Sequence, residues 1–287
     1  MDAYEAAIRS LVKPGDVVLD VGAGTGVLSM LAARRGAARV HAVESMGVAG
    51  LARELVAANG LDGVVKVHQR DFVQMEALEA VDVIVSDFMG RFVVDDAMLE
   101  AVEASERWLK PGGVFCPGVV RMRLAPVGDI RLRSVDLFDE HLYGLVMDAG
   151  RKYALNYCYH VQLSPEALMA PPVDYRTLRP PKVSGGYDRT ISFVMQRPGA
   201  VRGLAGWFEA DMSPGVVLST QPGRGTHWGQ YLFTLPHVRV EAGDGLEVRL
   251  RFDEDAQLWR WSGRVERSGA TLVGFDLESE QRLGRRS

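Results

Sequence analysis

The stretch "DVVLDVGAGTGVLSMLAARRGAARVHAVE" (residues 16–44) decides the fold of the first part of the chain. It opens with an apolar run that has the length and composition of a buried parallel strand. A glycine-rich turn follows, and the apolar spacing of "VLSMLAARRG" predicts a helix that ends at Gly36. "ARVHAVE" (38–44) then predicts a second strand. Two strands joined by a helix indicate a parallel sheet with a right-handed crossover.

The same alternation continues along the chain. Strands are predicted over residues 63–71 and 80–87, and helices over 50–60 and 95–113. The last of these helices is expected to end at a Pro-Gly-Gly sequence. Helices of about ten residues or more between strands are typical of a doubly wound α/β fold. We therefore predict a first domain over residues 1–115.

Beyond this domain the sequence changes to short alternating segments bounded by Gly, Pro and Asp. They read "VVRMRLAPV", "TISFVMQRPG", "VRGLAGWFEADM", "GVVLSTQP", "HWGQYLFTLP", "LEVRLRFDED", "LWRWSGRV" and "ATLVGFDLE". This pattern predicts antiparallel β structure, a barrel or sandwich, over residues 116–287. Residues 136–172 interrupt it with helix-compatible sequence, so we expect an inserted arm over about 140–172.

Composition and charge restrict the possible functions. A net charge of -4 offers no basic footprint, which argues against nucleic acid as a partner. Cys116 and Cys158 are the only cysteines, so no disulfide framework is implied and a reducing compartment fits. The chain shows neither a signal peptide at its start nor a run of about 18 apolar residues. We expect a soluble cytoplasmic protein without a membrane partner.

The glycines of the opening stretch indicate a ligand site. Because the turn from strand to helix carries glycine at alternate positions, backbone can approach a ligand at the carboxyl edge of the sheet. A dinucleotide fingerprint would place its third glycine at position 27, which is Val27, so a ligand without a pyrophosphate is favoured. Glu44 ends the second strand, where it can accept hydrogen bonds from ribose hydroxyls. Asp71 ends the third strand, where it can accept a hydrogen bond from an adenine amino group. The alternative is that the glycines serve only a tight turn.

Three stretches carry a resemblance to a known family. "VVLDVGAGTGVLSMLAARRGAARVHAVE" (17–44) resembles the S-adenosylmethionine site of class I methyltransferases, and nearly the whole chain resembles the protein arginine methyltransferases, as a divergent member of bacterial type. "SDFMGRFVVDDAML" (86–99) stands where that family has its double-glutamate hairpin. "STQPGRGTHWGQYLF" (219–233) matches the family's threonine-histidine-tryptophan loop, which the barrel contributes to the active site. The alternative is that Trp228 belongs to the barrel core and that the hydrogen bonds of His227 beside it are satisfied there.

The resemblance implies a Rossmann-like methyltransferase domain, a β-barrel domain with a helical dimerisation arm, and a homodimer. It implies S-adenosylmethionine as cofactor and transfer of a methyl group to the guanidinium of arginine in a protein, a peptide or a small molecule. The expected cofactor-binding residues are Asp20, Gly22, Gly24, Thr25, Gly26, Glu44, Asp71 and Phe72. The expected catalytic residues are Asp87, Asp96 and His227, and the expected substrate-binding residues are Met89, Arg91 and Trp228. No metal is expected.

The hairpin departs from the family pattern. Both family glutamates are aspartates here, Asp87 and Asp96, although the nine-residue step between them is kept. Aspartate is one methylene shorter, a difference in reach on the order of 1 Å, which is enough to misplace a substrate. Either the hairpin moves inward or the substrate is not a peptidyl arginine. Asp96 has the alternative role of a helix N-terminal acid. Arg91 stands where the family usually has a tyrosine, and its charge can occupy the guanidinium pocket.

A second departure is at the start, where "MDAYEAAI" (1–8) matches only the end of the family's N-terminal helix. The family's aspartate partner of the loop histidine and its arginine for the cofactor carboxylate would fall before residue 1, which leaves Asp2 as a weak substitute. Two other functions stay open: a small-molecule methyltransferase of the same fold that acts on another amine or metabolite, and a non-catalytic cofactor-binding module. The intact set of cofactor residues argues against the second.

Overall fold

A computed structural model of the chain describes residues 1–90, 92–93, 99–139, 142–253 and 256–279. Contacts divide the chain into two compact units. The first unit comprises Met1–Arg121, Thr177–Ser184 and Glu209–Ser219. The second unit comprises Met122–Arg176, Gly185–Phe208 and Thr220–Ser287. The first unit therefore contains the predicted first domain together with two segments from later in the chain.

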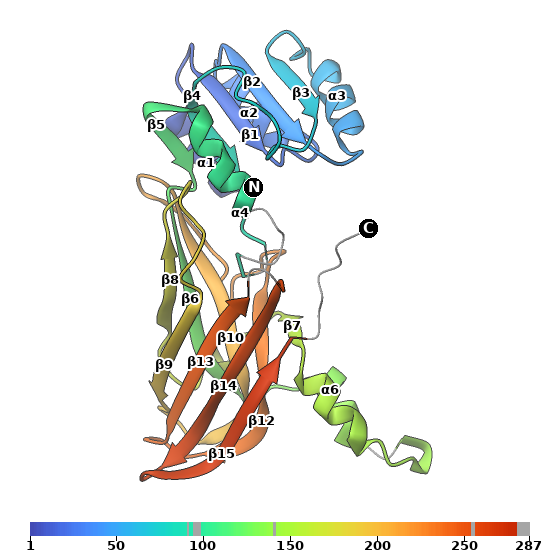
Figure 1. Cartoon of the computed structure of the whole chain (residues 1–287), viewed down its shortest axis with the longest axis vertical. Helices are drawn as coiled ribbons and strands as arrows, with labels where there is room; N and C mark the ends of the chain where they lie inside the picture. Colours follow the sequence, from blue (N-terminus) through green and yellow to red (C-terminus); the bar gives the residue numbers. More distant parts are fainter. Residues whose placement is uncertain (91, 94–98, 140–141, 254–255, 280–287) are drawn as a thin grey trace. The chain divides into compact units, whose positions relative to one another are not determined.

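The first unit is built on a five-stranded sheet in the order β3-β2-β1-β4-β5 (Figure 1). Its strands are β1 Val17–Val21, β2 Arg39–Glu44, β3 Val65–Gln69, β4 Val81–Ser86 and β5 Leu109–Cys116. All the strand pairs in this sheet are parallel. The strand order reverses at β1, as in a doubly wound sheet, so that the carboxyl ends of β1 and β4 flank the switch point where ligands bind. The predicted α/β fold is confirmed.

The helices of the first unit follow from local sequence signals. They are α1 Asp2–Leu11, α2 Val27–Arg34, α3 Ala49–Ala58 and α4 Leu99–Ala104. The amphipathic α1 buries Tyr4, Ala7 and Ile8, and α2 begins directly after Gly26. No helix in the described part of the chain has the length and apolarity needed to cross a membrane.

The long helix predicted over residues 95–113 is wrong in its second half. In the structure α4 ends at Ala104, a 3-10 turn covers Ser105–Trp108, and strand β5 begins at Leu109. The Pro-Gly-Gly sequence lies inside this strand instead of ending a helix. An edge strand tolerates proline and glycine, since one side of it makes no ladder hydrogen bonds, and β5 pairs only with β4.

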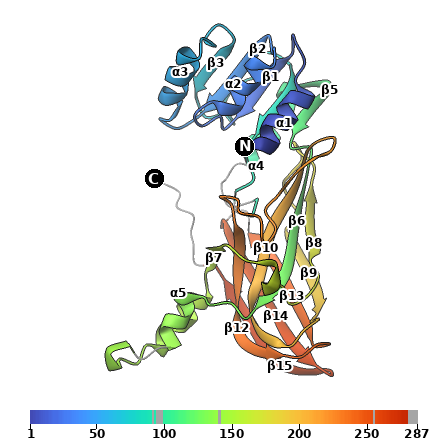
Figure 2. The same ribbon diagram turned by 180° about the vertical axis from the view of Figure 1, so that it is seen from behind.

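The rest of the chain is antiparallel β structure in two sheets (Figures 1 and 2). One sheet has the order β7-β12-β10-β6-β8, with β11 paired to β10, and the other has the order β15-β14-β13-β9. The strands are β6 Val119–Gly128, β7 Cys158–Val161, β8 Val173–Leu178, β9 Asp188–Val194, β10 Gly199–Ser213, β11 Val216–Ser219, β12 Gln230–Val240, β13 Gly245–Asp253, β14 Leu258–Arg267 and β15 Ala270–Glu278. Each of the eight predicted segments overlaps one of these strands. Strand β7 falls within sequence expected to be helix-compatible, because its pairing with β12 overrides a weak local preference.

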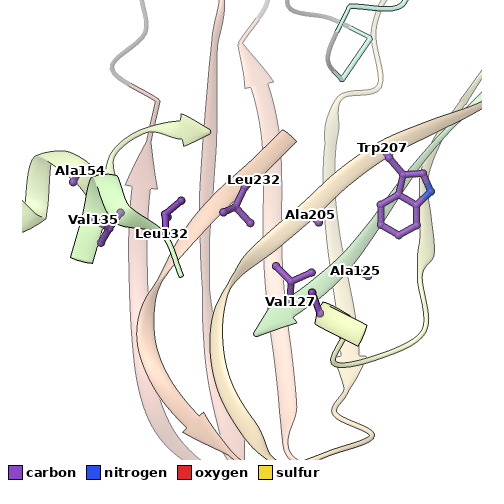
Figure 3. Packing of buried hydrophobic residues seen from close by; sticks show 9 residues of the cluster. Ala125, Val127, Leu132, Val135, Ala154, Ala205, Trp207 and Leu232 are labelled. Carbon is purple, nitrogen blue, oxygen red and sulfur yellow. The ribbon is translucent and has the colours of Figure 1, made fainter. Parts of the chain in front are cut away.

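The arm lies between β6 and β7, in the second unit. It contains α5 Arg133–Asp136, α6 Arg151–Leu155 and the 3-10 turns Leu137–Asp139, Leu142–Gly144 and Asp148–Gly150; a further 3-10 turn, Pro165–Ala167, follows β7. Its base is an apolar cluster that joins the arm to β6, β10 and β12 (Figure 3), made of Ala125, Val127, Leu132, Val135, Ala154, Ala167, Ala205, Trp207 and Leu232. Burial of these side chains anchors the arm to the second unit.

Candidate active site

The glycine loop at the end of β1 is left-handed at every glycine. Gly22, Gly24 and Gly26 have φ values of 71°, 55° and 79°, a region in which side chains with a Cβ are strained. The backbone N–H groups of Gly22 and Ala23 both donate to the carbonyl oxygen of Val43 at 3.0 Å, which ties the loop to β2. A Cβ built on Gly24 would meet nothing within 4 Å. The loop is thus rigidly held and open on one side, as a ligand site requires. Thr25 lies within it, half-buried.

Glu44 is held in place by the same loop. Its two carboxylate oxygens accept hydrogen bonds from the backbone N–H groups of Gly24 at 2.9 Å and Met46 at 2.8 Å. Each carboxylate oxygen has a second lone pair, so the group can still accept two hydroxyl hydrogens from a ligand. Glu44 is therefore preorganised at the position predicted for ribose binding.

Asp20 presents a buried acceptor without a partner. Its side chain is 1% exposed, Oδ2 accepts the Ser29 hydroxyl at 2.6 Å, and Oδ1 is buried without a hydrogen bond. Burial raises the pKa of the Asp20 carboxyl to about 7, against the lowering effect of the Ser29 hydrogen bonds. The charges of Asp87 and Glu44 raise it further. Buried polar atoms in folded proteins nearly always have partners, so Oδ1 indicates a ligand or solvent contact.

Asp71 and Phe72 begin the loop that follows β3. The carboxylate of Asp71 accepts hydrogen bonds from the backbone N–H of Val73 and the side-chain amide of Gln74, both at 3.0 Å. Asp71 is exposed, whereas Phe72 is buried with its ring 5.7 Å from that of Trp108. Asp71 thus shapes its own turn and keeps free lone pairs toward solvent.

Asp87 follows β4 and is exposed at the carboxyl edge of the sheet. The hydroxyl of Tyr4 shares its hydrogen between the carbonyl oxygen of Ser86 at 3.1 Å and Oδ1 of Asp87 at 3.3 Å. Burial, and after it the nearby Asp87 charge, raises the pKa of Tyr4 well above its ordinary value. Tyr4 therefore stays neutral and orients Asp87. The sequence assigned Tyr4 no role, because helix and strand meet only in the tertiary structure.

The remaining hairpin residues differ in their status. Met89 is 0% exposed and belongs to the buried core, and its predicted role in substrate binding stays a prediction. Arg91 and Asp96 lie outside the described residues. Their predicted roles, in substrate binding and catalysis, stay predictions.

His227 and Trp228 form a turn in the second unit. The two rings are in contact, with centroids 3.8 Å apart and planes inclined by 35°, and Trp228 meets Phe208 edge-on at 5.5 Å. His227 is exposed and Trp228 is half-buried, so this histidine is not part of the barrel core. That His227 and Trp228 act together with Asp87 stays a prediction.

Side chains of β7 and of the residue after it hold this turn in place. His160 Nε2 lies 2.6 Å from the carbonyl oxygen of Trp228, and the Gln162 amide donates to the carbonyl oxygen of Thr226 at 2.7 Å. A Cβ on Gly229 would lie 2.5 Å from the carbonyl oxygen of Val161, so only glycine fits there. We call His160 and Gln162 the β7 clasp. The sequence contained no signal for it, since the clasp depends on the pairing of β7 with β12.

Two family models match the chain. One is described as a methyltransferase domain and matches residues 18–113. The other is described as the arginine methyltransferase oligomerization subdomain and matches residues 121–262. The first match contains the glycine loop and Asp87, and the second contains the arm and the His227-Trp228 turn.

The chain is also similar to curated proteins. It is 38% identical to protein arginine N-methyltransferase 6 of Xenopus laevis over 245 residues, which are 79% of this chain and 72% of that protein. It is 35% identical to protein arginine N-methyltransferase PRMT10 of Oryza sativa subsp. japonica over 292 residues, 86% of this chain and 76% of that protein.

Solved structures show the same likeness. The Trypanosoma brucei PRMT1 enzyme-prozyme heterotetrameric complex with AdoHcy matches with a TM-score of 0.86 and 25% identity, over 97% of this chain and 93% of that chain. Protein arginine methyltransferase 10 of Arabidopsis thaliana matches with a TM-score of 0.82 and 27% identity over the same shares of the two chains.

Proposed function

The chain belongs to the protein arginine N-methyltransferase family, and from this premise we propose how its residues carry out S-adenosylmethionine-dependent methylation of arginine. The observation that carries the assignment is the place of Asp87. This carboxylate is exposed at the end of β4, is oriented by Tyr4, and lies at the same sheet edge as the glycine loop and Glu44.

The residues at this edge fit S-adenosylmethionine. The open glycine loop leaves room for close approach of a ligand, and the preorganised Glu44 carboxylate suits a ribose. Asp71 and Phe72 serve the adenine. The buried, unpartnered oxygen of Asp20 offers negative charge to the cationic end of the cofactor. When bound, the cofactor supplies a methyl group already activated by its sulfonium.

Asp87 is the charge partner of the substrate guanidinium. A guanidinium is a poor nucleophile because its lone pairs are delocalised and its pKa exceeds about 12. A carboxylate on one side draws the positive charge toward the nitrogens it contacts and leaves the remaining nitrogen better able to attack the methyl carbon. Since the donor is already activated, the protein has mainly to orient the nucleophile and stabilise its charge. Asp96 assists Asp87, and the roles of His227 in catalysis and of Trp228 in substrate binding are kept as predicted from the sequence.

The substrate is an arginine in a protein or peptide. The support for this choice over free arginine is the similarity to relatives named protein arginine N-methyltransferases. Methyl transfer from labelled cofactor to free arginine, to arginine-rich peptides and to a cell lysate separates the alternatives, with mass spectrometry to locate the methyl group.

Replacement of Asp87 tests the assignment. Asp87→Asn keeps the shape and removes the charge, so turnover should fall at least about a hundredfold while cofactor affinity stays normal. Tyr4→Phe removes the hydroxyl that donates to Asp87 and to the Ser86 carbonyl but keeps the Asp87 charge, so it should lower turnover less. Asp62→Asn, at an exposed aspartate of the same unit, is the matched control. Near-normal turnover of Asp87→Asn, or a product methylated on oxygen or carbon, would sink the role of Asp87.

The enzyme acts as a homodimer in which the arm packs on the first unit of the partner. Large apolar side chains stand exposed near the end of the arm: Tyr143 at 99%, Val146 at 77% and Leu145 at 62%. Free loops rarely expose such a patch without a partner. A pocket of about 270 Å³ in the first unit, on α1 and α2, is the proposed docking place of these side chains on the partner. Its lining residues are Glu5, Ile8, Arg9, Leu31, Arg34 and Arg35.

The protein is cytoplasmic. Both cysteines, Cys116 and Cys158, are buried and neither belongs to a disulfide bond, which suits a reducing compartment. Fractionation of cells that produce the protein at its native level tests this location, and recovery outside the cytoplasmic fraction would contradict it.

A further inference from the structure

One guanidinium gathers the carbonyl oxygens of the loop that contains Phe72. Arg107 lies in the 3-10 turn Ser105–Trp108, far from this loop in sequence. Its Nη2 donates to the carbonyl oxygens of Phe72 and Val73, both at 3.0 Å, and to that of Met75. Three carbonyl dipoles therefore converge on one cationic nitrogen. Without the cation these carbonyl dipoles would repel one another.

The loop has little else to fix its backbone. Residues 70–80 form no strand or helix. Within them the Met75 N–H donates to the Phe72 carbonyl, and the Asp71 carboxylate accepts from the Val73 N–H and the Gln74 side-chain amide. Phe72 and Met75 are buried and anchor the loop to the core of the first unit, whereas Asp71 is exposed. The direction of the Asp71 carboxylate thus depends on the turn that Arg107 holds.

Arg107 also contacts the ring next to Asp71. Its guanidinium carbon lies 5.7 Å from the ring centroid of Phe72, and the other neighbour of that ring is Trp108, at 5.7 Å. Arg107 and Trp108 therefore hold Phe72 together: Arg107 contacts its backbone and its ring, and Trp108 contacts its ring. A lysine would keep the charge but lacks the planar group that stacks on an aromatic ring.

We propose that Arg107 is a positioning residue for the adenine subsite, acting through the backbone of residues 72–75 on Asp71 and Phe72. This rests on the proposed roles of those two residues at the adenine. The expected consequence is base-specific: loss of Arg107 weakens the contacts to the adenine amino group and leaves the ribose contact of Glu44 intact.

Calorimetry with two ligands measures how much the adenine amino group contributes to binding. One ligand is S-adenosylhomocysteine, and the other is its analogue in which a purine without the amino group replaces adenine. The wild-type protein should bind the analogue more weakly by roughly tenfold, since Asp71 loses a donor. Arg107→Met should bind S-adenosylhomocysteine roughly tenfold more weakly and bind the two ligands about equally. Arg107→Lys should fall between the two proteins, and it carries the test if Arg107→Met does not fold.

A second arginine and the separate effects on KM and kcat serve as controls. Arg53 is an exposed arginine on α3 of the same unit, outside residues 70–80, so Arg53→Met should keep the wild-type preference between the ligands. In steady-state assays Arg107→Met should raise the KM for S-adenosylmethionine and change kcat at saturation by less than about twofold.

The possible failures are distinguishable. If the wild-type protein binds both ligands equally, the adenine role of Asp71 is wrong and the proposal falls with it. If the wild-type protein discriminates and Arg107→Met keeps that discrimination, the positioning role of Arg107 alone is wrong. Equal weakening of both ligands would also overturn it, because that result indicates a general disturbance of the unit.

Discussion

Asp20 immediately precedes the glycine loop, and burial raises the pKa of its carboxyl to about 7. An unfolded chain has an ordinary aspartate pKa near 4. The folded protein therefore binds more protons than the unfolded chain between about pH 4 and pH 7. The contribution of Asp20 to stability is complete below about pH 4 and is lost as the pH rises through about 7. Asp20 thus makes the cofactor-free enzyme less stable at neutral and higher pH.

The Asp20→Asn variant tests this linkage. Because asparagine does not titrate, the variant should gain free energy of unfolding relative to the wild type between pH 5 and pH 8, on the order of a few kcal/mol. Urea denaturation of the cofactor-free proteins at several pH values gives the comparison. Parallel stability curves for the two proteins would contradict the raised pKa. Added S-adenosylhomocysteine should stabilise the wild type more at pH 8 than at pH 5, since an ionised Asp20 suits its ammonium group.

At the scale of elements, β7 connects the arm to the turn that carries His227 and Trp228. A carbonyl oxygen can only accept a hydrogen bond, so His160 Nε2 must carry the hydrogen that it shares with the Trp228 carbonyl. Gln162 makes the second contact, to the Thr226 carbonyl. The β7 clasp follows helix α6 of the arm in sequence, so β7 links the arm to the turn along the chain.

Removal of the β7 clasp should therefore loosen the turn. In the double variant His160→Ala, Gln162→Ala, hydrogen exchange at the amides of residues 226–229 should become faster, and turnover should fall roughly tenfold or more as His227 and Trp228 lose their place. Cofactor affinity should not change. Lys152→Ala, at an exposed arm residue outside the clasp, is the control. Unchanged exchange rates would show that the turn holds itself.

At the scale of the whole molecule, the exposed apolar end of the arm predicts association. Leu145→Asp with Val146→Asp places two charges where the homodimer would bury apolar side chains, so the double variant should be monomeric at micromolar concentration by light scattering. Leu272→Asp changes an exposed leucine of β15, which lies outside the arm, and should leave the mass unchanged. A monomeric mass for the folded wild-type protein would exclude the homodimer.

Much of the molecule could be predicted from the sequence because it depends on local signals. Strand and helix periodicity, glycines at left-handed positions and acids at strand ends act over short stretches of chain. They correctly indicated the doubly wound sheet, the antiparallel strands and the glycine loop. The second half of the 95–113 helix failed because "RWLKPGG" keeps helical apolar spacing, while its pairing with β4 makes it an edge strand.

Tertiary structure alone decided which side chains support the site. Tyr4 meets Asp87 across 83 positions of sequence, His160 meets Trp228 across 68, and Arg107 meets Phe72 across 35. It also buried Met89, which the hairpin pattern had suggested for substrate binding. Burial and hydrogen bonding between distant segments depend on how elements pack, and no local periodicity encodes that packing. Local sequence signals therefore specify the fold class and the residue types at the strand ends, whereas packing specifies which side chains orient them.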